Sequence, residues 1–280
     1  MIDHDNLEEF ADPLNYDIED SSNTGVAFYT ALAKETGGSV LEIACGTGRD
    51  CITSEQRGFT VTGLDIVPGM LEQARRKSVG LSIRWVEGDA RNFDLGEQFK
   101  LIFLTGNAFQ AFLTRADQEA LLHCVKKHLY EDGLFAFETR NPRWAKSPYA
   151  RQTPMSSPEQ GLFTLLETRD EEEDGPGCTD SNGRIVQVSR TQTYNHVAQI
   201  LHWKRYWRWQ EGEKEHTKVT RIAVRFTFPQ ELEALLHYNG FTILRQYGDW
   251  NLEPLTGSSP SIISVCRKKR RSKHPQMRTA

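Results

Sequence analysis

A short apolar run that ends in two closely spaced glycines constrains this chain more than any other feature. It covers residues 40–49 and reads VLEIACGTGR. Such a run is typical of a buried parallel strand that turns into a helix, whose first backbone amides face a ligand. Gly46 and Gly48 tolerate positive φ and let a ligand approach the backbone closely. The run therefore predicts an α/β fold with a ligand site at this turn.

Strand and helix signals alternate from residue 24 to residue 140. Strands are expected at residues 40–44, 59–64, 81–86, 99–104 and 134–139. Helices are expected at residues 24–33, after residue 48, from residue 68 and from residue 114. Residues 114–117 resemble a capping box, and the helix that they open should stop before Gly133. This alternation predicts a mostly parallel sheet with right-handed crossovers.

The pattern changes after residue 141. Prolines interrupt residues 142–158, and β-rich runs follow at 162–168, 184–194, 197–209 and 217–228. Their polar–apolar alternation predicts an antiparallel sheet, and the acidic residues 170–177 should form a flexible loop. A helix at 229–239 and strands at 241–247 and 262–267 resume the first pattern. We expect a core of residues 1–140 and 229–267, an inserted antiparallel substrate lid at 141–228, and a disordered basic tail at 268–280.

Composition and charge exclude several classes of function. A formal net charge of -4 is too mild to imply a nucleic-acid surface, and no apolar run approaches the length of a membrane span. The five cysteines form no CxxC pair, so neither a disulfide framework nor a metal site is expected. Reduced cysteines and an acidic N-terminus without an apolar stretch favour a cytoplasmic location.

Acidic residues follow two further strands and complete a nucleoside pocket. In an open α/β sheet, ligands bind beyond the carboxyl ends of the strands. Asp65 ends the second strand, where a carboxylate can accept hydrogen bonds from both ribose hydroxyls. Asp89 follows the third strand and can accept a hydrogen bond from an adenine amine. The fourth strand ends in residues 104–107, whose small residues leave room for a reacting group, with Thr105 and Asn107 as polar candidates.

Three strings in this order carry a resemblance to a known family. LEIACGTGRD, VTGLDIVPGMLEQAR and VEGDARNF resemble motifs I, II and III of class I S-adenosylmethionine-dependent methyltransferases. The resemblance covers residues 16–140 and 229–267, in the style of bacterial small-molecule enzymes such as the deoxysugar N,N-dimethyltransferases. It implies a Rossmann-like sheet of seven strands with a reversed last hairpin, and S-adenosyl-L-methionine as cofactor.

The resemblance also implies which residues bind the cofactor. Tyr16 matches a family position that reaches the methionine carboxylate, which Arg49 could also neutralise. The full candidate set comprises Tyr16, Glu42, Ala44, Gly46, Gly48, Arg49, Asp65, Ile66, Met70, Asp89, Ala90 and Leu104.

Two other functions remain open at this point. An NAD-dependent oxidoreductase would need a third glycine or an alanine after the turn, where this chain has Cys51. A cofactor-binding interaction protein without catalysis would keep the same glycines and acids.

The methyl acceptor is expected to be a small molecule that reacts through nitrogen or oxygen. A protein or RNA acceptor, recruited by the basic tail, is the open alternative. The insertion should cover the cleft, so its side chains are the candidates for catalysis and specificity. The weak catalytic candidates are Tyr149, His196, His202 and Tyr206, with Arg140, Asn141, Trp144 and Trp203 close to the expected opening. Trp203, Arg205, Trp207 and Trp209 alternate along one strand and therefore share a face. That face could pack on the main sheet, form a pocket wall or form a homodimer seam, and packing combined with a pocket wall is favoured.

Overall fold

A computed structural model describes residues 6–19, 24–142, 166 and 168–269. The main sheet consists of β1 (Val40–Ile43), β2 (Val61–Asp65), β3 (Ile83–Glu87), β4 (Phe99–Leu104), β5 (Leu129–Arg140), β11 (Phe241–Tyr247) and β12 (Ser261–Lys268). Its strand order is β11-β12-β5-β4-β1-β2-β3. The first five strands pair in parallel, whereas β12 runs antiparallel between β5 and β11. The predicted seven-stranded sheet with a reversed last hairpin is confirmed.

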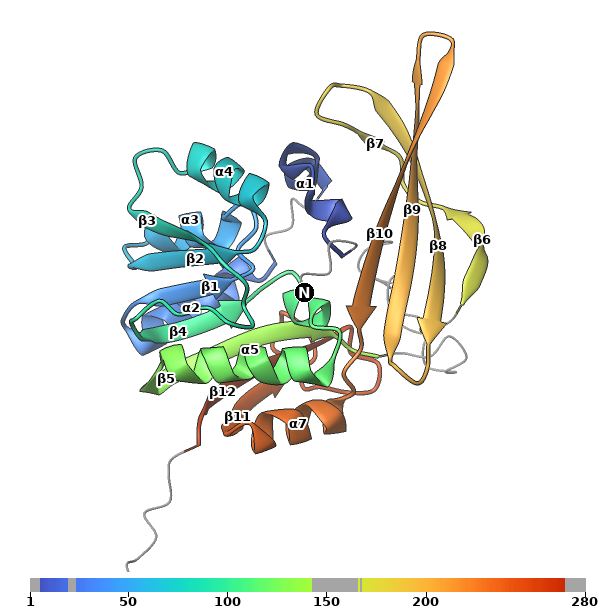
Figure 1. Cartoon of the computed structure of the whole chain (residues 1–280). Helices are drawn as coiled ribbons and strands as arrows, with labels where there is room; N and C mark the ends of the chain where they lie inside the picture. The colour runs from blue at the N-terminus through green and yellow to red at the C-terminus, as the bar shows by residue number, and fades with distance from the viewer. Residues whose placement is uncertain (1–5, 20–23, 143–165, 167, 270–280) are drawn as a thin grey trace, which may run out of the picture.

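Helices cover both faces of this sheet (Figure 1). One face packs against α2 (Val26–Thr36), α3 (Arg49–Glu55) and α4 (Pro68–Lys77), and the other against α5 (Arg115–His128) and α7 (Pro229–Tyr238). The alternation along β4 decides which side each residue joins. Leu101 and Phe103 join the apolar cluster of α2, whereas Ile102 and Leu104 join that of α5. Parallel strands buried on both faces explain the continuous apolar runs in the sequence.

A second, antiparallel sheet is inserted between β5 and α7. It contains β6 (Arg169–Asp174), β7 (Cys178–Thr179), β8 (Ile185–Asn195), β9 (Ile200–Glu211) and β10 (Lys214–Arg225). The order is β10-β9-β8-β6, and β7 also pairs with β8. This sheet has an apolar cluster of its own around Leu201, Trp203 and Phe226. In Figure 1 it stands beside the main sheet, with η2 (Glu8–Phe10) and α1 (Pro13–Glu19) between them.

The end of α5 differs from the sequence prediction. The predicted capping box is confirmed at its start, where Thr114 and Asp117 exchange hydrogen bonds. The helix nevertheless stops at His128, and β5 begins at Leu129, five residues before the predicted strand. Leu129 pairs with Phe99 and is fully buried, and the register then shifts. Gly133 is therefore a strand residue packed on Leu129 and not a helix cap.

The acidic segment also differs from its prediction, because residues 169–174 form β6 and not a loop. One cation from β9 and one from β6 itself compensate its charge. Arg208 lies 2.8 Å from Glu172, and Arg169 lies 2.6 Å from Glu173. The strand β12 extends to Lys268, one residue into the expected tail. Residues 270–280, and most of the predicted run 162–168, lie outside the described residues. Among the described helices, none is long and apolar enough to cross a membrane.

Candidate functional site

The glycine turn after β1 has a left-handed backbone at three positions. Ala44, Gly46 and Gly48 have φ values of 57°, 54° and 81°. A Cβ at Gly48 would lie 2.3 Å from Trp85, so both packing and conformation require glycine there. A Cβ at Gly46 would meet only Tyr16, at 3.8 Å. Gly46 lines a large cavity, whereas Gly48 serves as the N-cap of α3.

Asp65 ends β2 and ties the glycine turn to the next loop. One carboxylate oxygen accepts the Gly46 N–H at 2.7 Å, and the other accepts the Val67 N–H at 2.8 Å. Asp65 is 7% exposed, and this burial raises the pKa of its carboxyl above the ordinary value. A carboxylate offers about four acceptor sites, so capacity for a ligand diol remains. Sequence reasoning found Asp65 but missed its role in holding the turn.

Asp89 follows β3 and lines the same cavity, but a neighbouring guanidinium already contacts both of its oxygens. Arg91 Nε lies 3.0 Å from each oxygen, and a terminal nitrogen lies 2.7 Å from one of them. Arg91 also bonds to Asp117 at 3.1 Å. Partial burial raises the pKa of Asp89, but the hydrogen bonds from Arg91 outweigh it and lower the pKa overall. The sequence did not indicate this network.

The cavity lies at the carboxyl edge of the main sheet and has a volume of about 1860 Å³. Small-molecule pockets are usually about 300–1,000 Å³, so there is space for more than one ligand. Leu104 is fully buried, and its carbonyl accepts the Tyr29 hydroxyl. Of the twelve cofactor candidates, ten line the cavity, and Gly48 and Leu104 do not: the ten are Tyr16, Glu42, Ala44, Gly46, Arg49, Asp65, Ile66, Met70, Asp89 and Ala90.

Three carboxylates form the floor of the cavity beside the glycine turn. Glu42, Asp50 and Glu138 all line it and are 2%, 9% and 4% exposed. The Cys51 thiol donates to Glu42 at 2.9 Å. Burial, followed by repulsion from Asp50, raises the pKa of Glu42 well above its ordinary value. We call this group the acidic floor. Only Glu42 was among the sequence candidates.

Two members of the acidic floor accept hydrogen bonds from residues that follow β4: Glu42 from the Thr105 hydroxyl at 3.4 Å, and Glu138 from Asn107. The Glu138 carboxylate accepts the Tyr29 hydroxyl at 2.5 Å and the Asn107 N–H at 3.1 Å. Burial raises the pKa of Glu138 to about 7, although these hydrogen bonds lower it. Asn107 has a φ of 59°, and its Oδ1 is buried with no hydrogen-bond partner among the described residues. The sequence placed Asn107 here but gave Glu138 no role.

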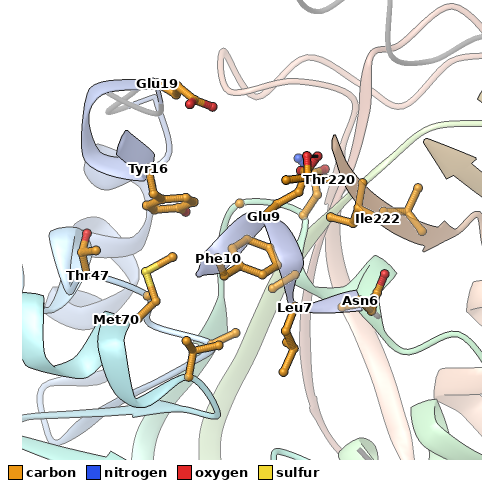
Figure 2. Close-up of a pocket in the computed structure, with 18 of the residues that line it drawn as sticks. Asn6, Leu7, Glu9, Phe10, Tyr16, Glu19, Thr47, Met70, Thr220 and Ile222 are labelled. Carbon is orange, nitrogen blue, oxygen red and sulfur yellow. Dashed lines mark hydrogen bonds between the residues drawn. The ribbon is translucent and has the colours of Figure 1, made fainter. Parts of the chain in front are cut away.

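The N-terminal segment, residues 6–19, lies between the two sheets. Asp17 bonds to Thr47 in the glycine turn at 2.5 Å and to Lys77 of α4 at 2.7 Å. Figure 2 shows Tyr16 beside Thr47, and Phe10 between Met70 and the inserted sheet. On the other side, Glu9 lies 3.2 Å from Arg205 of β9. The segment therefore closes the cavity between the cofactor candidates and the insertion.

Unlike most of the cofactor candidates, the described catalytic candidates His196, His202 and Tyr206 do not line the cavity. Tyr149 and Trp144 lie outside the described residues. His196 and His202 are exposed, and neither lines the cavity. Tyr206 does not line it either, because it shares the opposite strand face with His202. Asn141 is buried, and its amide donates to the carbonyls of Thr256 and Ser259. Instead, the cavity wall contains Arg140 from β5 and the alternate β9 residues Trp203, Arg205, Trp207 and Trp209. The four β9 residues therefore share a face, as the alternation predicted, and that face lines the cavity.

Residues 40–133 match a protein family that is described as a methyltransferase domain. A cypemycin N-terminal methyltransferase from a Streptomyces species is 27% identical over 119 residues, which cover 42% of this chain and 48% of the relative. A dTDP-3-amino-3,6-dideoxy-alpha-D-glucopyranose N,N-dimethyltransferase from Streptomyces fradiae is 30% identical over 106 residues, or 38% of this chain and 40% of that protein. The chain therefore spans less than half the length of these relatives.

The likeness in structure extends over nearly the whole chain. A solved S-adenosylmethionine-dependent methyltransferase from Clostridium acetobutylicum has a TM-score of 0.71, and the match covers 91% of this chain and 96% of that one. The two chains are 18% identical, so this match establishes the fold. The chain has the fold of the class I S-adenosylmethionine-dependent methyltransferases, and its residues 40–133 match the methyltransferase domain family.

Proposed function

We propose that this chain transfers a methyl group from S-adenosyl-L-methionine to the nitrogen of a small-molecule amine. The acidic floor is the observation that carries the proposal. The cofactor brings a sulfonium and an ammonium group, and a carboxylate beside either group favours its positive charge. The same carboxylates would repel the pyrophosphate of a dinucleotide, which argues against an NAD-dependent oxidoreductase. Cys51 at the third position of the glycine motif argues in the same direction.

The residues around the floor fit the remaining parts of this cofactor. Asp65 would accept hydrogen bonds from the ribose diol through its remaining acceptor capacity. Ile66 and Met70 of α4, which both line the cavity, would pack against the adenine. Asp89 would share its oxygens between Arg91 and the exocyclic amine. Tyr16 would close the site from the N-terminal segment.

The residues near the end of β4 suit a nitrogen nucleophile. When bound, the cofactor supplies a methyl group on an activated leaving group, so the protein mainly aligns the reactants. The buried Oδ1 of Asn107 would accept an N–H of the amine and orient its lone pair. With the amine held there, the new N–C bond would form as the C–S bond breaks, and the C–S electron pair would stay on sulfur. The proton lost from nitrogen would pass to Glu138, whose pKa of about 7 suits a general base.

The names of two relatives also support nitrogen over oxygen. One is an N-terminal methyltransferase and the other an N,N-dimethyltransferase. A small acceptor is favoured over nucleic acid by the net charge of -4 and by the tryptophans of the cavity wall. A homodimer through the inserted sheet and a cytoplasmic location stay predictions.

Calorimetry and a transfer assay test the proposal in two steps. The protein should bind S-adenosylmethionine and its demethylated form but not NAD. It should then move a radiolabelled methyl group to primary amines in a panel. Asn107→Ala should keep cofactor affinity and lose transfer. His202→Ala, which changes an exposed residue outside the cavity, should keep both. Binding of NAD alone, or labelling of hydroxyl acceptors only, would refute the proposal.

A further inference from the structure

Two arginines lie directly opposite each other on the cavity face of the inserted sheet. Arg190 of β8 pairs in register with Arg205 of β9, and both line the cavity. Directly opposite residues on neighbouring strands have Cβ atoms about 4.5–5.5 Å apart, and like charges there are destabilising. Arg190 is 5% exposed, so its guanidinium has also lost most of its contact with water. Sheet stability alone does not favour this pair.

The surroundings of the pair form a recognition surface for an anion. Arg205 lies with its guanidinium 6.0 Å from the ring centroid of Trp207. Arg140 reaches the same wall from β5, with its guanidinium 5.8 Å from the ring centroid of Trp203. These contacts hold guanidinium groups against aromatic walls, a setting in which arginine binds carboxylates and phosphates by paired hydrogen bonds.

Three carboxylates lie near the two guanidinium groups. Glu173 of β6 lies 3.7 Å from Arg190, while Glu9 and Glu19 of the N-terminal segment lie 3.2 Å and 3.9 Å from Arg205. Burial raises the pKa of Glu9, with the attraction of Arg205 only partly opposing it, and the pKa of Glu19 is raised to about 6 for the same reasons. An anion that binds Arg205 would therefore take the place of these two carboxylates.

The cavity thus carries acidic and basic groups in different parts of its lining. The acidic floor, which comes from β1, β5 and α3, favours the cationic sulfonium and the amine. Arg190 and Arg205 line the cavity from the inserted sheet, and Arg140 of β5 lies against Trp203 of that sheet. We infer that this arginine wall is a subsite for an acidic group, a carboxylate or a phosphate, that the amine acceptor carries elsewhere in its structure. The inference rests on the proposed function, because it assigns the second recognition element of the same acceptor.

Anion binding can be measured without knowing the acceptor. The thermal unfolding midpoint is recorded with the demethylated cofactor present, at constant ionic strength, while chloride is replaced by inorganic phosphate or by acetate. We expect either anion, at about ten times its dissociation constant, to raise the midpoint by a few degrees. A larger shift with phosphate would assign a phosphate-bearing amine, and a larger shift with acetate would assign an amino acid-like acceptor.

Three variants decide whether the arginine wall is responsible. Arg190→Gln and Arg205→Gln should each abolish the shift, and Arg205 is the safer substitution because its side chain is 24% exposed. Arg208→Gln is the matched control, since Arg208 lies on the same strand, contacts Ser189 and Glu172, and does not line the cavity. Equal shifts in all proteins, or no shift beyond chloride, would overturn the inference. Repeating the titration without nucleoside separates failure of this subsite from failure of cofactor binding.

Discussion

Replacing Glu138 with glutamine should remove a pH dependence from cofactor binding. The pKa of this buried carboxyl is about 7 in the empty protein, against an ordinary value of 4.5. The sulfonium of the cofactor favours the charged carboxylate, so binding lowers this pKa and releases a proton. With a pKa near 7, roughly one carboxyl in ten is ionised at pH 6 and nine in ten at pH 8. Affinity should therefore rise about tenfold over that interval, or about 1.4 kcal/mol.

The groups that face Glu138 determine the controls for this experiment. Tyr29 and Asn107 donate to it, and Asp50 repels it. Glu42 has a raised pKa of its own and adds a pH dependence that Glu138→Gln leaves in place. The pH dependence of affinity must therefore be compared between the variant and the wild type, because the variant is not expected to bind with the same affinity at every pH.

Isothermal titration at pH 6, 7 and 8, in buffers of different ionisation enthalpy, measures affinity and proton release together. S-adenosylmethionine should show the tenfold change, and S-adenosylhomocysteine, which lacks the sulfonium charge, should show a smaller one. Glu138→Gln should reduce the difference between the two ligands. If wild type and variant follow the same pH profile with both ligands, Glu138 does not sense the sulfonium, and the assignment of the acidic floor is wrong.

Four further predictions concern binding and stability. Asp65→Ala should weaken cofactor binding by about a hundredfold in calorimetry, because hydrogen bonds to a charged group contribute about 1.5–3 kcal/mol each; undiminished affinity would contradict the ribose assignment. Gly63→Ala should cost about 1–3 kcal/mol in chemical denaturation, since its Cβ would lie 2.6 Å from Trp85, and a second change of Trp85 to Phe should restore part of it. Thr114→Ala should cost about 1 kcal/mol of unfolding free energy by removing the capping box, and an unchanged urea midpoint would speak against it. The empty protein should lose up to about 3 kcal/mol as pH rises from 4.5 through 7, because Glu138 binds its proton more tightly when folded; Glu138→Gln should flatten that decline in urea unfolding.

The core of the fold could be predicted because its signals are local. Strands buried on both faces give continuous apolar runs, and glycines mark the turns at which they end. The boundary between α5 and β5 could not be predicted from local signals. Residues 129–132 continue the helical pattern in the sequence, but the pairing of Leu129 with Phe99 makes them part of a strand. The acidic β6 was missed for a similar reason. Arg208, which compensates Glu172, lies 36 positions away in the sequence.

Local sequence signals also predicted part of the cofactor half of the site. Asp65 and Asp89 were found because each follows an apolar strand. Glu138 also follows an apolar run, residues 134–137, so the same rule applied to β5 would have found it. The bonds of Asp65 to Gly46 and of Asp89 to Arg91 carry no such signal, since they depend on how loops from different strands meet.

The acceptor half depends on a single property of the inserted sheet, the register between β8 and β9. Period-two alternation placed Trp203, Arg205 and Trp207 on one face from the sequence alone. It does not indicate which residue of β8 lies opposite each of them. The loop at residues 196–199 fixes that, with Asn195 accepting two backbone N–H groups and Gln199 at a φ of 57°. A slip of one residue would turn Arg190 to the outer face and remove the arginine pair. The hairpin loop therefore determines whether the cavity has a cationic wall, although no residue of the loop needs to touch the ligand.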